Sequence, residues 1–132
     1  MIENTIAAWH ECVETGDPVK LDALLHEDAT FHSPVVHTPQ RGKSITFMYL
    51  MAAFKVLNGD SFTYVREVVG PSDAVLEFTT TIDGIDINGV DIIHWGDDGR
   101  ITDFKVMIRP LKAINLVHQM MASMLTKSAK VM

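Results

Sequence analysis

Asp91 is the residue of this sequence best placed to do chemistry. Residues 85–95 have the composition of a β-strand, in which successive side chains point to opposite faces, so Asp91 shares a face with Ile93. The same face of the neighbouring predicted strands is apolar, carrying Phe78, Phe104 and Ile108. Burial among such side chains disfavours the ionised carboxylate and raises its pKa. We therefore expect Asp91 to be a neutral acid inside an apolar pocket.

Two interpretations of Asp91 follow from that placement. In the first, Asp91 is catalytic, as a general acid, or donates a hydrogen bond to a ligand oxygen. In the second, it is a purely structural acid that pairs with the indole N–H of Trp9 or the hydroxyl of Ser33. The sequence leaves both interpretations open.

Two histidines flank the loop that follows the first predicted strand. His32 alternates with Phe31 and Ser33 and should point away from them, whereas His37 lies in the loop over the expected pocket mouth. The six histidines show no i,i+4 pair and no cluster with carboxylates at ligand spacing. We therefore expect no metal and no cofactor.

Composition limits the class of protein. The 132 residues suit one domain, residues 1–132, and 47% of them are hydrophobic, which is typical of a chain that buries a core. Eleven basic and seventeen acidic residues give a net charge of −6, so a nucleic-acid partner is not expected. No apolar run is long enough to span a membrane, no signal-peptide pattern opens the chain, and Cys12 is the single cysteine. These features favour the cytoplasm.

Hydrophobic spacing predicts the elements that position these residues. Helical spacing predicts three helices: residues 2–15, residues 19–26 after an Asp17-Pro18 cap, and residues 45–57 after a Ser44 cap. A short strand, residues 29–33, and a loop, residues 34–42, separate the second helix from the third. Alternation then predicts four strands, in residues 62–69, 74–83, 85–95 and 101–108, before a terminal helix over residues 111–126.

This order predicts an α+β fold in which a curved antiparallel sheet packs on the N-terminal helices. A curved sheet over helices has a concave face, which is where small ligands bind. The residues that we expect to line a ligand pocket there are Trp9, Phe31, Ser33, His37, Tyr49, Phe78, Ile93, Phe104 and Ile108.

Three blocks in this order resemble the nuclear transport factor 2-like superfamily, in particular its SnoaL-like and ketosteroid isomerase-like proteins. The first is Gly16-Asp17 followed by LLHEDATF at residues 24–31, and the second is Ser33-Pro34-Val35 followed by PQRGK at residues 39–43. The third is DIIHWGDDGRI at residues 91–101. The resemblance covers residues 2–110 and implies a cone-shaped fold, here with an extra C-terminal helix.

The resemblance also assigns roles to positions. Ketosteroid isomerase uses an Asp base, with an oxyanion hole made of a Tyr and a protonated Asp. The matching positions here are Ser33 for the base, Trp9 for the Tyr and Asp91 for the oxyanion-hole acid. A serine hydroxyl does not take a C–H proton near pH 7 as a carboxylate does. We therefore predict no steroid isomerase activity.

Three functions remain open. The first is a binding protein for a small hydrophobic molecule, and the second is a cofactor-free isomerase, lyase or hydrolase with Asp91 as acid and a first-strand-loop histidine as base. The third is a dimeric interaction module. The family resemblance suggests a homodimer through the convex sheet face, with Val75, Thr79 and Thr81, and the Met-rich terminal helix is either a pocket lid or a dimer contact.

Overall fold

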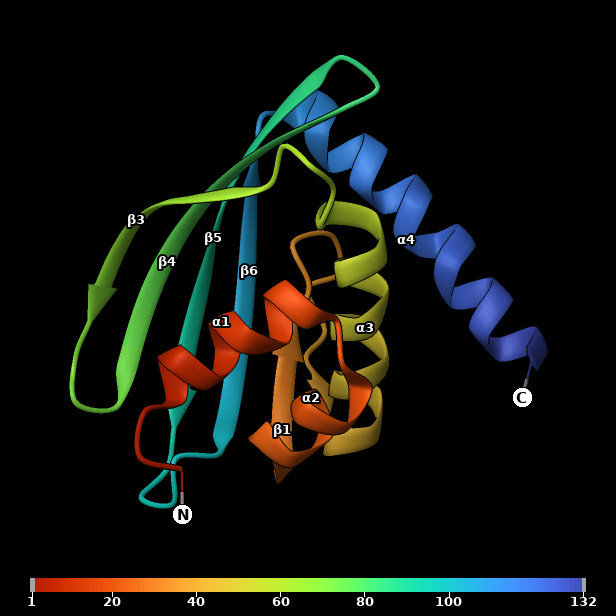
Figure 1. The fold of residues 1–132 in the computed structure, drawn as a ribbon. Helices are drawn as coiled ribbons and strands as arrows, with labels where there is room; N and C mark the ends of the chain where they lie inside the picture. Colours follow the sequence, from red (N-terminus) through yellow and green to blue (C-terminus); the bar gives the residue numbers. More distant parts are fainter. Residues whose placement is uncertain (1, 132) are drawn as a thin grey trace.

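One curved sheet of six strands dominates the structure (Figure 1). The computed structural model describes residues 2–131, with the side chains of residues 2–126. The strands are β1 (Leu25–His32), β2 (Gln40–Arg41), β3 (Thr63–Val69), β4 (Asp73–Ile82), β5 (Ile85–Trp95) and β6 (Ile101–Arg109). Their order across the sheet is β2-β1-β6-β5-β4-β3. Neighbours are antiparallel except β1 and β6, which run parallel.

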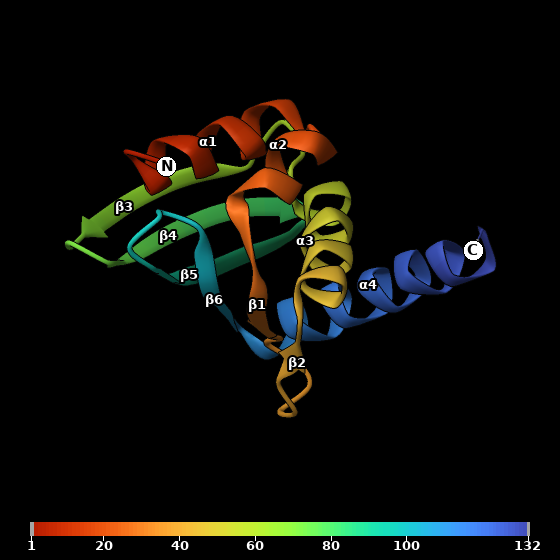
Figure 2. The ribbon, with the colours of Figure 1, turned by 90° about the horizontal axis from the view of Figure 1, so that it is seen from below.

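Four helices accompany the sheet: α1 (Thr5–Thr15), α2 (Pro18–Leu24), α3 (Lys43–Leu57) and α4 (Leu111–Val131). Figures 1 and 2 show α1 and α3 lying in the hollow of the sheet, while α4 passes α3 and its C-terminal half extends away from the body. No helix in the described part of the chain is long and apolar enough to cross a membrane.

Local capping sets the helix boundaries. The Asn4 side chain accepts the Ala7 N–H at the start of α1, and the Asp17 side chain accepts the Val19 N–H at the start of α2. Gly16, with φ of 64°, ends α1 in a left-handed conformation that glycine adopts without steric penalty. The prediction of a Ser44 cap was wrong, because α3 begins at Lys43 after Gly42 and has no side-chain cap.

Alternation along the strands builds the core. On β4 the inward residues Ala74, Leu76, Phe78 and Thr80 are buried, and on β5 the inward residues Ile87, Gly89, Asp91 and Ile93 are buried. Phe78 pairs with Gly89 across the two strands. A Cβ at residue 89 would overlap the Phe78 ring and lie 2.8 Å from the Met107 carbonyl oxygen, so only glycine leaves room for that ring.

The predicted α+β fold class is therefore confirmed, with four local differences. The first strand starts earlier, at Leu25, directly after α2, and the predicted loop at residues 34–42 contains the short strand β2. The sheet is mixed because β1 returns parallel to β6. The terminal helix also runs past its predicted end at Thr126.

Candidate functional site

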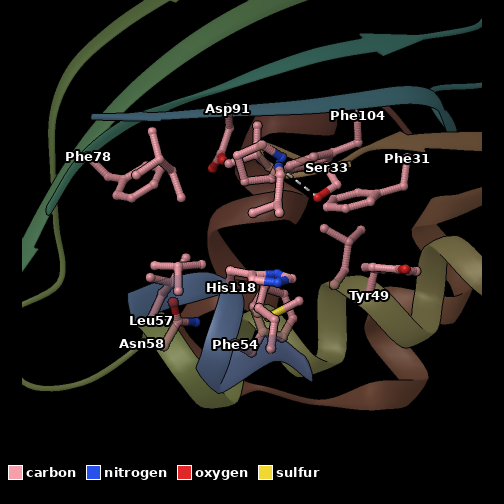
Figure 3. A pocket seen from close by; sticks show the side chains of 18 of the residues that line it. Phe31, Ser33, Tyr49, Phe54, Leu57, Asn58, Phe78, Asp91, Phe104 and His118 are labelled. Carbon is pink, nitrogen blue, oxygen red and sulfur yellow. Dashed lines mark hydrogen bonds between the residues drawn. The ribbon is translucent and has the colours of Figure 1, made fainter. Parts of the chain in front are cut away.

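A cavity of about 240 Å³ lies between the concave sheet face and helices α1, α3 and α4. Its walls are mainly aromatic and aliphatic. Figure 3 shows Phe78, Asp91 and Phe104 on the sheet side, facing Phe54, Leu57 and His118 across the open space. The polar or titratable residues of the lining are Ser33, Tyr49, Asn58, Tyr64, Asp91 and His118. Asp91 is the single carboxyl in this lining.

Most of the predicted pocket residues lie in the lining. They are Trp9, Phe31, Ser33, Tyr49, Phe78, Phe104, Ile108 and Asp91. Two predicted positions were wrong. His37 is exposed in the loop before β2 and is absent from the lining, because that loop turns its side chain toward solvent. Ile93 faces inward on β5 and is completely buried, but it packs in the core rather than against the cavity.

The Asp91 carboxyl ends a chain of two hydrogen bonds. The Tyr64 hydroxyl donates to Asp91 Oδ2 at 2.6 Å, and the Trp9 indole N–H donates to the Tyr64 oxygen at 3.0 Å. The structural interpretation of Asp91 had expected direct pairing with Trp9 or Ser33, and this was wrong. Trp9 reaches the acid only through Tyr64, and the Ser33 oxygen instead accepts the N–H groups of Val35 and Val36.

The donor chemistry of Trp9 fixes the direction of this chain. An indole N–H only donates, so the Tyr64 oxygen accepts from it, and the single hydroxyl proton of Tyr64 goes to Asp91 Oδ2. When Asp91 is protonated, its own proton therefore sits on Oδ1. Within the described residues, Oδ1 forms no hydrogen bond. Every fully buried side-chain N or O in that part of the chain has a partner, so Oδ1 is not fully buried. The free oxygen is thus the one that meets the cavity.

Burial controls the charge of the acid. Asp91 is only 6% exposed, and its desolvation raises the carboxyl pKa from 3.8 to about 7, although the hydrogen bond from Tyr64 acts in the opposite direction. Burial and the neighbouring carboxylate also raise the pKa of Tyr64, so its hydroxyl keeps its proton and remains a donor. Near neutral pH, Asp91 therefore exchanges between a neutral donor and a carboxylate acceptor.

Tyr64 is a polar pocket residue that the sequence analysis missed. Its position on β3 pairs with Phe78 on β4, but the register shifts between Tyr64 and Arg66. This irregularity lets Tyr64 and Glu67 both face inward, although their odd spacing predicts opposite faces. No glycine or proline marks it in the sequence. The run of β-branched and aromatic residues around Tyr64 was the only available signal.

The first-strand histidines do not reach the pocket. His32 points outward, as expected, and its Nε2 lies 2.8 Å from Asp103 Oδ1. His37 is exposed as well, so neither candidate base from this loop lies in the pocket lining. The histidine that does line the pocket is His118, from α4, which the sequence analysis did not single out. The described residues contain no group of three or more His, Cys, Asp or Glu side chains arranged to hold a metal ion.

Comparison with known proteins agrees with this fold. Residues 6–104 match the SnoaL-like domain family, and the chain belongs to that family. Comparison with curated protein sequences gives no match.

Solved structures extend the likeness over almost the whole chain. A steroid delta-isomerase from Pseudomonas aeruginosa is 32% identical, with a TM-score of 0.86, and the match covers 96% of this chain and 92% of that one. An uncharacterised protein with a cystatin-like fold from Silicibacter pomeroyi is 30% identical, with a TM-score of 0.88 and coverage of 98% and 90%. A nuclear transport factor 2-like protein of unknown function from Mesorhizobium loti, at 17% identity and a TM-score of 0.69 over 80% and 88%, shares the fold.

Proposed function

We propose that this protein binds one small, largely apolar molecule through a hydrogen bond between a ligand oxygen and Asp91. The observation that carries the proposal is the free Oδ1 of a buried acid, held by Tyr64 and open to an apolar cavity. In its neutral form this acid donates to a carbonyl oxygen, and the surrounding rings supply apolar contact. The SnoaL-like fold is consistent with such a ligand-binding domain.

The size of the cavity limits the ligand. An engineered cavity of roughly 150 Å³ in another protein holds one benzene molecule. The cavity here, about 240 Å³, exceeds that volume by about the same factor by which the volume of two fused aromatic rings exceeds that of one ring. A flat bicyclic ketone therefore fits the space beside Asp91, and the oxygen of the ketone is an acceptor only.

2-Acetylnaphthalene is the probe for this proposal, with binding followed by calorimetry from pH 5 to 9. If only neutral Asp91 donates to the ketone, affinity should be constant at low pH, fall by about fivefold as the pH passes through about 7, and then level off. In Asp91→Asn, the side-chain amide can occupy the Oδ1 position and donate at every pH, so binding should persist and lose its pH dependence.

Asp91→Leu provides the matched apolar control. It fills the same space without a donor, so the ketone should bind about fivefold more weakly than to the wild type at pH 5. Wild-type affinity that is flat across pH 5 to 9, or equal affinity in the wild type and Asp91→Leu, would show that Asp91 does not contact the ligand oxygen. Native mass spectrometry of the purified protein then tests for a co-purified molecule.

A second candidate is a cofactor-free isomerase, lyase or hydrolase with Asp91 as acid. It is favoured by the 32% identity to the Pseudomonas aeruginosa steroid delta-isomerase, together with an acid whose pKa of about 7 suits proton transfer. For steroids themselves we expect no turnover, because Ser33 replaces the base and its oxygen is engaged in a turn. Isomerisation of a Δ5-ketosteroid that disappears in Asp91→Asn would prove this expectation wrong.

The homodimer is also a proposal. Several apolar side chains are exposed on the convex side of the sheet, including Val68, Val75 and Met107. Covering them with a second copy removes apolar surface from water. Light scattering should give a dimer for the wild type and a monomer for Val75→Asp, whereas Val19→Asp, on the distant helix α2, should remain dimeric. A monomeric wild type would exclude this arrangement.

A further inference from the structure

His118 lies on the wall of the cavity opposite Asp91. Figure 3 shows its imidazole facing the open space from α4, across from the Asp91 carboxyl on the sheet. The pocket face of α4 consists of residues at helical spacing, Val117, His118, Met121, Ala122 and Leu125. A single polar side chain thus interrupts an otherwise apolar stripe.

His118 differs from most other histidines in having no partner among the described residues. His10, His32 and His94 each have a ring nitrogen close to a carboxylate oxygen, and His26 Nδ1 accepts the Asp28 N–H. Within the described residues, His118 forms no hydrogen bond and no ion pair. His37 is likewise unpaired there, but it is exposed in the loop before β2 and lies outside the pocket lining. Among the six histidines, His118 alone combines unused ring nitrogens with a place in the cavity wall.

Three other polar side chains in the lining already form hydrogen bonds, whereas the Tyr49 hydroxyl forms none within the described residues. Ser33 accepts two backbone N–H groups, and the Asn58 amide donates to the Val13 carbonyl oxygen at 3.3 Å. Tyr64 donates to Asp91 and accepts from Trp9. Asp91 Oδ1 and the His118 ring are therefore hydrogen-bonding sites on opposite walls, separated by apolar side chains.

We propose that His118 is the second hydrogen-bonding group of the pocket, so that the ligand is a flat molecule of about two rings with an oxygen at each end. One oxygen is a carbonyl that accepts from Asp91, and the other is a hydroxyl that bonds to the His118 ring. This inference rests on the proposed binding function and adds the polarity of the ligand. It makes His118 a specificity-determining residue.

A pair of probes isolates the contribution of His118. 2-Acetylnaphthalene has only the carbonyl, whereas 6-acetyl-2-naphthol adds a hydroxyl at the far end of the same ring system. At pH 6, where Asp91 is mostly neutral, calorimetry on the full chain should show the naphthol binding about fivefold more tightly, as one added hydrogen bond provides.

Three variants assign that preference to one side chain. His118→Leu should bind both probes equally, at the affinity that the wild type shows for the ketone. His118→Gln, which keeps a donor and an acceptor, should restore part of the preference. His37→Leu removes the other unpaired histidine, which lies outside the lining, and should behave as the wild type. Because His118 and His37 are both exposed, neither change should impair folding.

The outcomes separate this inference from the function on which it rests. If the wild type does not bind 2-acetylnaphthalene, the binding proposal fails and the role of His118 fails with it. If the ketone binds but the naphthol binds no more tightly, only the role of His118 is wrong. A naphthol preference that persists in His118→Leu also overturns that role, because the hydroxyl then contacts some other group.

Discussion

Replacing Asp91 by Asn should remove a large pH dependence from the stability of this protein. In the folded state the Asp91 carboxyl has a pKa of about 7, against 3.8 for an ordinary aspartate in the unfolded chain. Between these values the folded protein holds a proton that the unfolded chain has lost. The free energy of unfolding therefore decreases as pH rises through this window, and it levels off above about 7, where both states have lost the proton.

The size of the effect follows from the two pKa values. At about 1.4 kcal/mol per pKa unit, a rise from 3.8 to about 7 corresponds to roughly 4 kcal/mol of stability that is present below pH 4 and lost by pH 8. The side-chain amide of Asp91→Asn is neutral throughout and can still accept the Tyr64 hydroxyl. The variant should therefore gain about 4 kcal/mol relative to the wild type over this range.

Urea unfolding, followed by circular dichroism at steps from pH 4 to 8, measures this difference directly. Subtracting the wild-type curve from that of Asp91→Asn cancels the groups that titrate in both proteins. Asp86→Asn, on the exposed face of the same strand, controls for the loss of one surface carboxylate. A difference that changes by less than about 1 kcal/mol over this range would refute the argument that burial holds Asp91 neutral.

Three further changes test the surroundings of the acid. Tyr64→Phe should destabilise the protein by about 1–3 kcal/mol and raise the Asp91 pKa further, because the hydrogen bond from Tyr64 lowers that pKa. Urea unfolding measures the stability and an NMR titration measures the pKa, and an unchanged pKa would contradict the hydrogen bond. Gly89→Ala should lower the free energy of unfolding by about 1–3 kcal/mol and weaken ketone binding, since the added methyl group displaces the Phe78 ring into the cavity. Wild-type stability and wild-type affinity in this variant would contradict the close approach of Gly89 to Phe78. Burial raises the pKa of the Cys12 thiol to about 11, so iodoacetamide at pH 8 should modify it only at the rate of unfolding; fast alkylation of the folded protein would contradict this burial.

Residue types and spacing were sufficient to predict the elements other than the short strand β2, and the inward face of Asp91. Strict alternation along residues 85–95 determines that Asp91 faces inward, and the same rule places Phe78 and Phe104 beside it. The pairing of Asp17 with Pro18 predicted the start of α2 for a local reason, because a cap is made within one turn of helix. Such features depend on neighbours along the chain and can be read from it.

The partners of Asp91 were decided by the tertiary structure alone. Tyr64 reaches the acid only because an irregularity in β3 turns its side chain inward and the curved sheet brings β3 toward β5 across β4. His118 enters the same cavity because α4 packs beside α3 after β6. Both placements bring together residues far apart in sequence, and helical or strand periodicity does not determine how far apart two elements lie in space. The sequence by itself therefore determined that a buried acid exists, whereas the packing of β3 and α4 decided which groups surround it.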